Sequence, residues 1–161
     1  EAFFEVAKGA TFDVITDGGV VQVLGTKFNV KSRKHYFEVQ CFEGVVRVKV
    51  GETKKKLHPG DSYRLIAGKQ ESTTITRATP EWMDNITTFK SVPFAMVISE
   101  FERQYNVVIS LDNIDTNRLF TGGFGHDNLN DALKAITSPL DISYHIDGKN
   151  HITMFYNHSK E

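Results

Sequence analysis

The second half of the chain contains two stretches whose apolar residues coincide when one is shifted by 35 residues. Each stretch reads as the end of a strand, a short amphipathic helix and an alternating strand, which predicts a duplicated β-α-β unit. Such a unit cannot bury its apolar face alone, so we expect the two copies to share one core. The aligned pairs are Phe89/Phe124, Phe94/Leu129, Val97/Ala132, Ile98/Leu133, Phe101/Ile136, Tyr105/Leu140, Val107/Ile142 and Ile109/Tyr144.

The complete pattern of this half predicts the order strand, helix, strand, strand, helix, strand, strand. Pro93 fits the first position of the first helix, where a missing N–H is harmless. Asn128 can cap the second helix. Glu100 and Glu102 lie two residues apart on the first helix, so they cannot face one another as an acid–base pair. We interpret these two glutamates as part of a solvated face.

The last two strands allow their register to be predicted. Pairing Ile146 with Ile152 keeps one face of the hairpin apolar and requires a three-residue loop at 148–150. Such a loop needs a left-handed residue, which we assign to Asn150. The same register brings His145, Asp147 and His151 together on the outer face. Imidazole and carboxylate groups can bind metal ions, but no further ligand is evident in the sequence. No metal site is therefore predicted.

The first half of the chain is rich in short β-branched and aromatic runs separated by Gly, Asp and Lys, and it shows no helical period. The runs lie at 12–15, 20–24, 28–30, 36–42, 45–50 and 62–66. This spacing leaves a sandwich, a jelly roll or a β-solenoid open. Periodicity is lost from about 70 to 84, so we expect an all-β domain at 1–78, a connection at 79–86 and the duplicated domain at 87–161.

The net charge of −1 conceals two halves of opposite sign. Residues 1–80 hold 13 Lys and Arg against 9 Asp and Glu, which gives +4, and residues 81–161 hold 6 against 11, which gives −5. The difference indicates either mutual docking of the halves or partners of different charge. The short run Lys54-Lys55-Lys56 is interpreted as a solvated hairpin between strands. Neither half has the strongly basic composition expected of a nucleic-acid-binding domain.

No motif in the chain predicts catalysis, a metal ion or a cofactor, so we expect that the protein is not an enzyme. Neither a nucleophile elbow nor a phosphate-binding loop is present. Gly122-Gly123-Phe124-Gly125 is interpreted as a strand end that makes room for a helix. Cys41 alternates with apolar neighbours and is expected to point inward. No apolar run is long enough to span a bilayer, and the chain opens within a strand, so it reads as the soluble part of something longer.

Four segments together resemble the FecR-type anti-sigma factors, especially their Bacteroidetes branch. They are Glu1-Ala2-Phe3-Phe4-Glu5-Val6, Val23-Leu24-Gly25-Thr26-Lys27-Phe28-Asn29-Val30, Glu43-Gly44-Val45-Val46 and Leu57-His58-Pro59-Gly60-Asp61. The resemblance continues through Trp82, Phe89, Pro93 and Tyr105-Asn106-Val107, which look like the C-terminal domain of that family. That domain is similar to the short N-terminal module of secretins and TonB-dependent receptors.

The resemblance implies a single-pass protein of the inner membrane, of which this chain matches the periplasmic region only. Its expected partner is the signalling domain of an outer-membrane TonB-dependent transporter. The family also binds an extracytoplasmic-function sigma factor through a cytoplasmic segment that is not among these residues. The implied role is therefore signal transduction: the ligand state of the transporter is passed to transcription by protein–protein contact.

An unpaired edge strand of the duplicated sheet is a template for strand addition by a partner. We expect that edge to lie in the strand with Val107, Ile109 and Leu111, or in the strand with Leu119, Thr121 and Phe124. The alternative function is an envelope carbohydrate- or small-ligand-binding module. Its signature would be exposed aromatic residues in a concave site, for which Tyr36, Phe42 and Tyr63 are the candidates.

Overall fold

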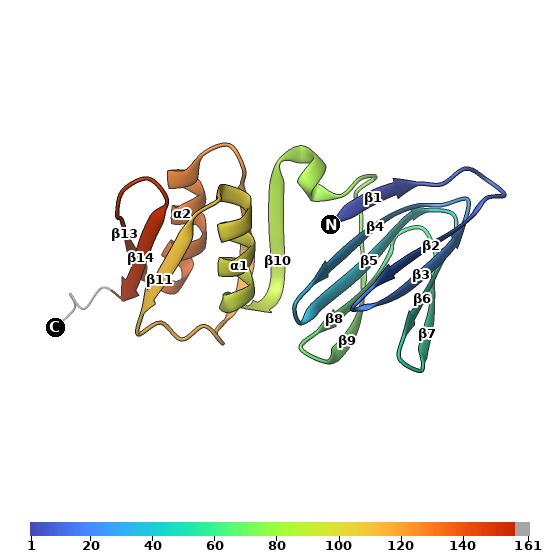
Figure 1. Cartoon of the computed structure of the whole chain (residues 1–161), viewed down its shortest axis with the longest axis horizontal. Coiled ribbons are helices and arrows are strands. Elements are labelled where there is room, and N and C mark those ends of the chain that lie inside the picture. Colours follow the sequence, from blue (N-terminus) through green and yellow to red (C-terminus); the bar gives the residue numbers. More distant parts are fainter. Residues whose placement is uncertain (157–161) are drawn as a thin grey trace. The chain divides into compact units, whose positions relative to one another are not determined.

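The computed structural model describes residues 1–156, which form two compact units that divide between Pro80 and Glu81 (Figure 1). Unit 1 is entirely β-structure, and unit 2 combines strands with two α-helices. The chain is therefore mainly β with an α+β second unit, as the sequence predicts. Within the described residues, no helix has both the length and the apolar character that crossing a membrane would require.

Unit 1 consists of two antiparallel sheets that bury one core between them. The strands of the first sheet, in spatial order, are β1 (Ala2–Glu5), β4 (Lys27–Arg33), β5 (Tyr36–Glu43), β8 (Asp61–Ile66) and β9 (Lys69–Thr74). The strands of the second are β2 (Thr11–Thr16), β3 (Gly19–Leu24), β6 (Val46–Val50) and β7 (Thr53–Leu57). Because both sheets contribute to the same apolar cluster, the unit is a two-sheet sandwich, which agrees with the sandwich and jelly-roll architectures that the sequence leaves open.

The core of unit 1 follows from strict alternation along its strands. In β5, Phe37, Val39 and Cys41 are fully buried, while the intervening side chains face outward. In β3, Val21 and Val23 lie opposite Val48 and Val46 of β6, and all four side chains are buried. Burial raises the pKa of the Cys41 thiol to about 11, so this cysteine is an inert apolar side chain, and its predicted inward orientation is confirmed.

Two segments of unit 1 differ from the sequence-based interpretation. Lys54-Lys55-Lys56 does not form a loop between strands but most of β7, the edge strand of the second sheet. Residues 69–74, placed partly in the aperiodic connection, form β9 at the edge of the first sheet. Both strands are polar because most of their side chains are exposed, and both are held by backbone hydrogen bonds to a neighbouring strand.

Unit 2 has the predicted order of strands and helices. After a short 3₁₀ helix (Glu81–Asp84) come β10 (Ile86–Pro93), α1 (Phe94–Tyr105), β11 (Val108–Asp112), β12 (Leu119–Gly125), α2 (Leu129–Thr137), a second 3₁₀ helix (Ser138–Leu140), β13 (Ile142–Ile146) and β14 (His151–Tyr156). The helices begin at Phe94 and Leu129, which are separated by the predicted 35-residue repeat. The structure thus confirms the duplication.

The two copies share their sheets as well as their core. The first strands of the copies, β10 and β12, pair with each other in an antiparallel two-stranded sheet. The second strands, β11 and β13, lie on either side of β14, which pairs parallel with β11 and antiparallel with β13. Both helices pack against strands of both sheets. The ring of Phe124 lies 5.0 Å from that of Phe101 in α1 and 6.0 Å from that of Phe89 in β10.

The local predictions for unit 2 hold with two exceptions. Asn128 caps α2, because its side-chain oxygen accepts the N–H groups of Asn130 and Asp131 at 2.9 and 3.1 Å. Pro93 is the N-cap of α1 rather than its first helical residue. The hairpin register is as predicted, with Ile146 opposite Ile152, but the left-handed loop residue is Gly148, with φ of 82°, and not Asn150. Glycine adopts this conformation without steric strain, which explains the difference.

A half-buried glutamate, Glu38, lies on the outer face of β5. Glu38 accepts hydrogen bonds from the Tyr36 hydroxyl at 2.8 Å and the Ser62 hydroxyl at 3.1 Å. Desolvation by burial nevertheless raises the pKa of Glu38 above its ordinary value of 4.5, although the two hydrogen bonds and the charge of Arg64 oppose this shift. The folded protein therefore takes up a proton at this site at a higher pH than the unfolded chain does.

The raised pKa of Glu38 predicts a specific dependence of stability on pH. A carboxyl group with a raised folded-state pKa contributes stability below its unfolded pKa and loses that contribution as pH rises through the folded pKa. We expect Glu38→Gln to flatten the decline in the free energy of unfolding as pH rises above 4.5, as measured by urea denaturation at several pH values. Parallel pH profiles for the variant and the natural protein would contradict the assignment.

Phe124 and Leu119 lie on the same strand but differ in burial, which gives a matched pair of substitutions. The side chain of Phe124 is 2% exposed and that of Leu119 is 64% exposed. Phe124→Ala should lower the free energy of unfolding by about 3–5 kcal/mol, because it leaves a cavity among aromatic rings. Leu119→Ala should change it by less than about 0.5 kcal/mol. Equal effects in urea denaturation would show that unit 2 is not packed as described.

Candidate functional site

The strand β11 forms one edge of the three-stranded sheet of unit 2, and its outward backbone is partly occupied. The N–H of Val108 donates to the carbonyl of Asn150 at 2.8 Å, so by alternation the backbone groups of Ile109 and Leu111 point away from β14. The Glu102 carboxylate accepts the N–H of Ile109 at 2.8 Å. The interpretation of Glu102 as a merely solvated residue is therefore wrong, since this side chain caps the edge strand.

The strand β12 is also partly occupied at its outward edge. The N–H of His126 donates to the carbonyl of Asn85 at 2.9 Å, so the backbone groups of Gly123 and Gly125 point away from β10. The Tyr105 hydroxyl donates to the carbonyl of Gly125 at 2.6 Å. Both caps come from the C-terminal turn of α1. Gly123 is needed for its small size, because a Cβ there would lie 2.5 Å from the Thr87 carbonyl. This glycine therefore makes room for β10, not for a helix.

The strand β13, at the other edge of the three-stranded sheet, has no such cap. The N–H of Asp147 donates to the carbonyl of His151 at 2.8 Å, so the backbone groups of Ile142, Tyr144 and Ile146 point outward. Across residues 1–156, no side chain hydrogen-bonds to these outward groups. The sequence analysis did not select β13, because the order of strands in the sheet could not be deduced from the pairing of one hairpin.

The internal repeat shows why β13 differs from β11. Adding the 35-residue offset to Glu102 and Ile109 gives Thr137 and Tyr144. Glu102 reaches forward to its strand, whereas the Thr137 hydroxyl donates back to the carbonyl of Leu133 at 2.8 Å within its own helix. Among the residues that the structure describes, equivalent backbone positions are therefore capped in the first copy and left without a side-chain cap in the second.

The six residues selected from sequence as an interaction edge fall on both candidate strands and differ in accessibility. The side chains of Val107, Ile109 and Phe124 are buried, that of Leu111 is half-buried, and those of Leu119 and Thr121 are exposed. Val107 precedes β11 rather than belonging to it. The Thr121 hydroxyl accepts the N–H of Ser91 at 2.9 Å, opposite the irregularity in β10. A partner could therefore contact Val107, Ile109 and Phe124 only through their backbone groups.

The predicted cluster of His145, Asp147 and His151 is present. The Asp147 carboxylate lies 3.3 Å from Nε2 of His145 and 3.4 Å from Nδ1 of His151. The hydrogen bond from the Thr153 hydroxyl, at 2.7 Å, is the largest influence that lowers the pKa of Asp147, and the histidines add to it. Among the described residues, no group of three or more His, Cys, Asp or Glu side chains is arranged to hold a metal ion.

The three aromatic residues considered for glycan binding do not come together. Tyr63 is 1% exposed and belongs to the core of the sandwich. Tyr36 and Phe42 lie on the opposite, outer face of the sheet, where Tyr36 bonds to Glu38 and Phe42 packs edge-on against Phe3. These residues therefore do not form the concave aromatic surface that the alternative function requires.

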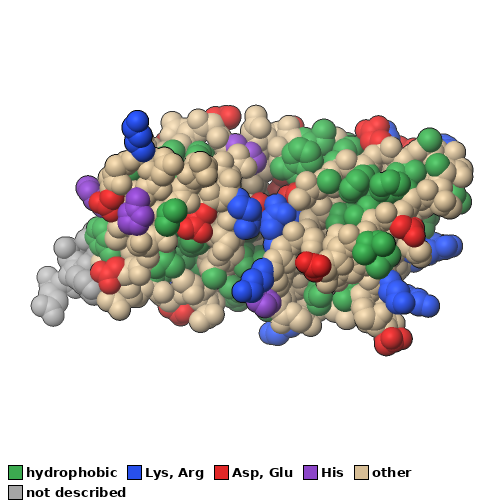
Figure 2. Space-filling view, in the orientation of Figure 1, with side chains coloured by type: hydrophobic (Ala, Val, Ile, Leu, Met, Phe, Trp, Pro, Cys, Tyr) green, Lys and Arg blue, Asp and Glu red, His purple; other side chains and the backbone are tan. Residues whose placement is uncertain are grey.

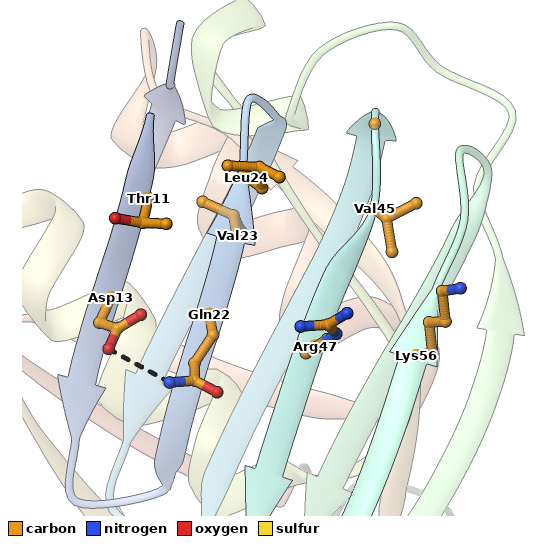
Figure 3. A pocket seen from close by; sticks show the side chains of 9 residues that line it. Thr11, Asp13, Gln22, Val23, Leu24, Val45, Arg47 and Lys56 are labelled. Carbon is orange, nitrogen blue, oxygen red and sulfur yellow. Dashed lines mark hydrogen bonds between the residues drawn. The ribbon is translucent and has the colours of Figure 1, made fainter. Parts of the chain in front are cut away.

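An open groove lies on the outer face of the second sheet of unit 1 (Figure 3). It is lined by Thr11, Asp13, Gln22, Val23, Leu24, Gly44, Val45, Arg47 and Lys56. Apolar side chains lie toward one end, and a row of polar side chains from Asp13 to Lys56 crosses all four strands. The only hydrogen bond drawn within this set joins Gln22 to Asp13 at 3.2 Å. Sequence analysis did not predict this groove, because its residues come from four separated segments.

Comparison with known proteins identifies the family through both units. The profile of the family described as "FecR, C-terminal" matches residues 86–153, and that of "FecR protein" matches residues 1–47. Two crystal structures of a "putative anti-sigma factor" from Parabacteroides distasonis, at 1.65 and 2.50 Å resolution, are similar to this chain, with TM-scores of 0.82 and 0.84. Each is 26% identical and covers 96% of this chain and 76% of its own. No curated protein matches the sequence.

The matched segments include most of the residues that resemble the family in sequence, whereas Leu57 to Asp61 and Trp82 lie outside both matches. The FecR match includes Val23 to Val30, and the C-terminal match begins at the first residue of β10 and ends within β14. The structural similarity extends over both units. The chain belongs to the FecR-type anti-sigma factors.

Proposed function

We propose that this chain is the periplasmic sensor region of a membrane-anchored anti-sigma factor. In this role it relays the ligand state of an outer-membrane TonB-dependent transporter to an extracytoplasmic-function sigma factor through protein–protein contact alone. Membership of the FecR-type family and the similarity to an anti-sigma factor structure support the proposal. The sigma factor would be bound by a cytoplasmic segment outside these residues, and no enzymatic step is required of the two units.

The open edge of β13 is the observation on which the docking proposal depends. The outward backbone groups of Ile142, Tyr144 and Ile146 form a row to which an extended segment of the transporter's signalling domain could add as a further strand. Each added backbone hydrogen bond contributes a net of about 0.5–1.5 kcal/mol. Short pairing of this kind fits a reversible association of roughly micromolar affinity, as a signal relay needs.

The two strands selected from sequence are less suitable for strand addition. A partner strand on β11 would have to displace Glu102 from the N–H of Ile109, and one on β12 would have to displace Tyr105 from the carbonyl of Gly125. Displacing a carboxylate from a backbone donor costs more than displacing water, because hydrogen bonds to charged groups are stronger. We therefore propose β13 as the docking strand, with β11 and β12 as protected edges.

The role of Glu102 as an edge cap can be measured directly. In Glu102→Ala the N–H of Ile109 loses its acceptor, so its amide hydrogen should exchange with solvent faster by about tenfold or more, given a charge-assisted bond of about 1.5–3 kcal/mol. Glu102→Gln retains a neutral acceptor and should give an intermediate rate. Exchange at Ile109 is followed by NMR. Unchanged protection in Glu102→Ala would show that β11 is not capped in solution.

Docking on β13 is tested with two substitutions at one position. Ile146→Pro removes an outward N–H and leaves the bonds between β13 and β14 in place, as is tolerated on edge strands. Ile146→Ala loses the same apolar packing but keeps the N–H. In calorimetric titration with the signalling domain of the transporter encoded beside this protein, we expect the alanine variant to bind and the proline variant to bind at least about tenfold more weakly.

Two results of this titration would contradict different parts of the proposal. Equal binding by Ile146→Pro and Ile146→Ala would reject β13 as the docking strand while leaving the partner intact. Absence of binding by the natural chain would reject the transporter signalling domain as the partner of the described units.

A further inference from the structure

The outer face of the second sheet of unit 1 holds two pairs of like charges directly opposite each other. Arg47 of β6 lies across from Lys56 of β7, and Lys49 lies across from Lys54. All four side chains are exposed. Arg47 and Lys49 alternate with buried valines of β6, and Lys56 and Lys54 share their outer face because they are their direct cross-strand partners. We call Arg47, Lys49, Lys54 and Lys56 the basic face. Like charges directly opposite in an antiparallel pair destabilise a sheet.

Protection of the sheet edge explains only half of this arrangement. Lysines on an edge strand such as β7 discourage unwanted strand pairing. Arg47 and Lys49 are on β6, an interior strand that is already paired on both sides by β3 and β7, so they cannot serve this purpose. Two interior cations placed opposite two edge cations therefore need another explanation.

No acidic side chain of this unit neutralises the basic face. Within the described part of the chain, none of its four members forms an ion pair. The nearest carboxylate in the same cross-strand row is that of Asp13, two strands away from Arg47 and bonded to Gln22. The positive charge of the face thus remains available to an external anion.

Exposed apolar side chains lie on the same outer face, beside the cations. Leu24 is 60% exposed, and Ile15 is 80% exposed. Leu24 lines the groove together with Val45, next to Arg47 and Lys56 (Figure 3). In the space-filling view, hydrophobic side chains gather over β2 and β3, and Lys and Arg side chains gather toward β7 (Figure 2). An occupant that satisfies the whole face must provide both carboxylates and apolar side chains.

We propose that this face of the β2-β3-β6-β7 sheet is a second docking surface, which binds an acidic polypeptide with apolar side chains among its carboxylates. Charge complementarity requires an anionic partner, and the exposed Leu24 and Ile15 require one with apolar contacts. An anionic membrane is a less suitable partner because of Asp13. The cross-strand row that contains Asp13 lies between the row of Leu24 and the row of Ile15, so its carboxylate would be repelled by lipid phosphate. The hydrogen-bonded pair Asp13 and Gln22 places neutral and acidic polar groups among the cations, a mixture that suits a protein partner.

This surface is separate from the edge of β13 and does not depend on the transporter being the partner. The test uses the whole chain and two short fluorescein-labelled peptides of equal length and charge, one of glutamate and leucine and one of glutamate and serine. Binding is measured by fluorescence anisotropy at several salt concentrations. We expect the glutamate–leucine peptide to bind more tightly, and its affinity to fall as salt rises.

Charge reversal on the interior strand provides the decisive variant. Arg47→Glu/Lys49→Glu places carboxylates opposite Lys56 and Lys54, so it replaces repulsion by attraction and should not lower the melting temperature. It should weaken binding of the glutamate–leucine peptide by about tenfold or more. The matched control, Lys34→Glu/Lys69→Glu, makes the same change in net charge at two exposed positions, in the turn after β4 and at the start of β9, and should leave binding unchanged.

Each contrary outcome overturns a stated part of the proposal. Equal weakening in the two double variants would show attraction to net charge and no site on the basic face. Equal affinity for the two peptides would remove the apolar contribution. Tighter binding to phosphatidylglycerol vesicles than to the peptide, abolished by Arg47→Glu/Lys49→Glu, would assign the face to a membrane. Self-association seen by sedimentation and abolished by the same variant would assign it to a second copy of this chain.

Discussion

The backbone of an open sheet needs hydrogen-bond partners at its edges, and unit 2 depends on how this need is met. Its two small sheets leave several strands with outward N–H and C=O groups. A side chain, water or another strand can satisfy these groups, and leaving one buried without a partner costs about 1–3 kcal/mol. Glu102 and Tyr105 of α1 supply partners at β11 and β12, whereas no side chain among residues 1–156 bonds to the outward groups of β13. We propose that this difference between the edges sets where the strand of a partner is added.

The duplication both creates the fold and introduces the difference between its edges. Each β-α-β copy lacks enough apolar surface to fold alone, so the copies exchange strands into common sheets and interleave the rings of Phe89, Phe101 and Phe124. The copies differ at the end of the helix, where Glu102 of the first corresponds to Thr137 of the second. A long carboxylate reaches the neighbouring strand, but a short hydroxyl bonds to its own helix. The difference between Glu102 and Thr137 therefore gives a capped edge at β11 and an uncapped edge at β13 within the described residues.

Much of the fold could be predicted because the spacing of apolar residues shows which positions are buried in each helix and strand. The order of elements in unit 2, the shared core and the pairing of Ile146 with Ile152 all follow from which positions must be buried. The polar edge strands β7 and β9 were missed because they depend on backbone pairing, which leaves no apolar pattern. The cap from Glu102 and the basic face were missed for a related reason. Both depend on which strands become neighbours, and the order of strands in a sheet cannot be deduced from the apolar pattern of a single sequence.

Hydrogen exchange along unit 2, measured with and without the signalling domain of the transporter, tests the proposed relay most directly. Amide exchange reports the gain of a hydrogen-bond partner at each backbone group. The amides of Ile142, Tyr144 and Ile146 should become protected in the complex, while that of Ile109, already bonded to Glu102, should change little. New protection confined to β11 or β12, with β13 unchanged, would contradict docking through the open edge.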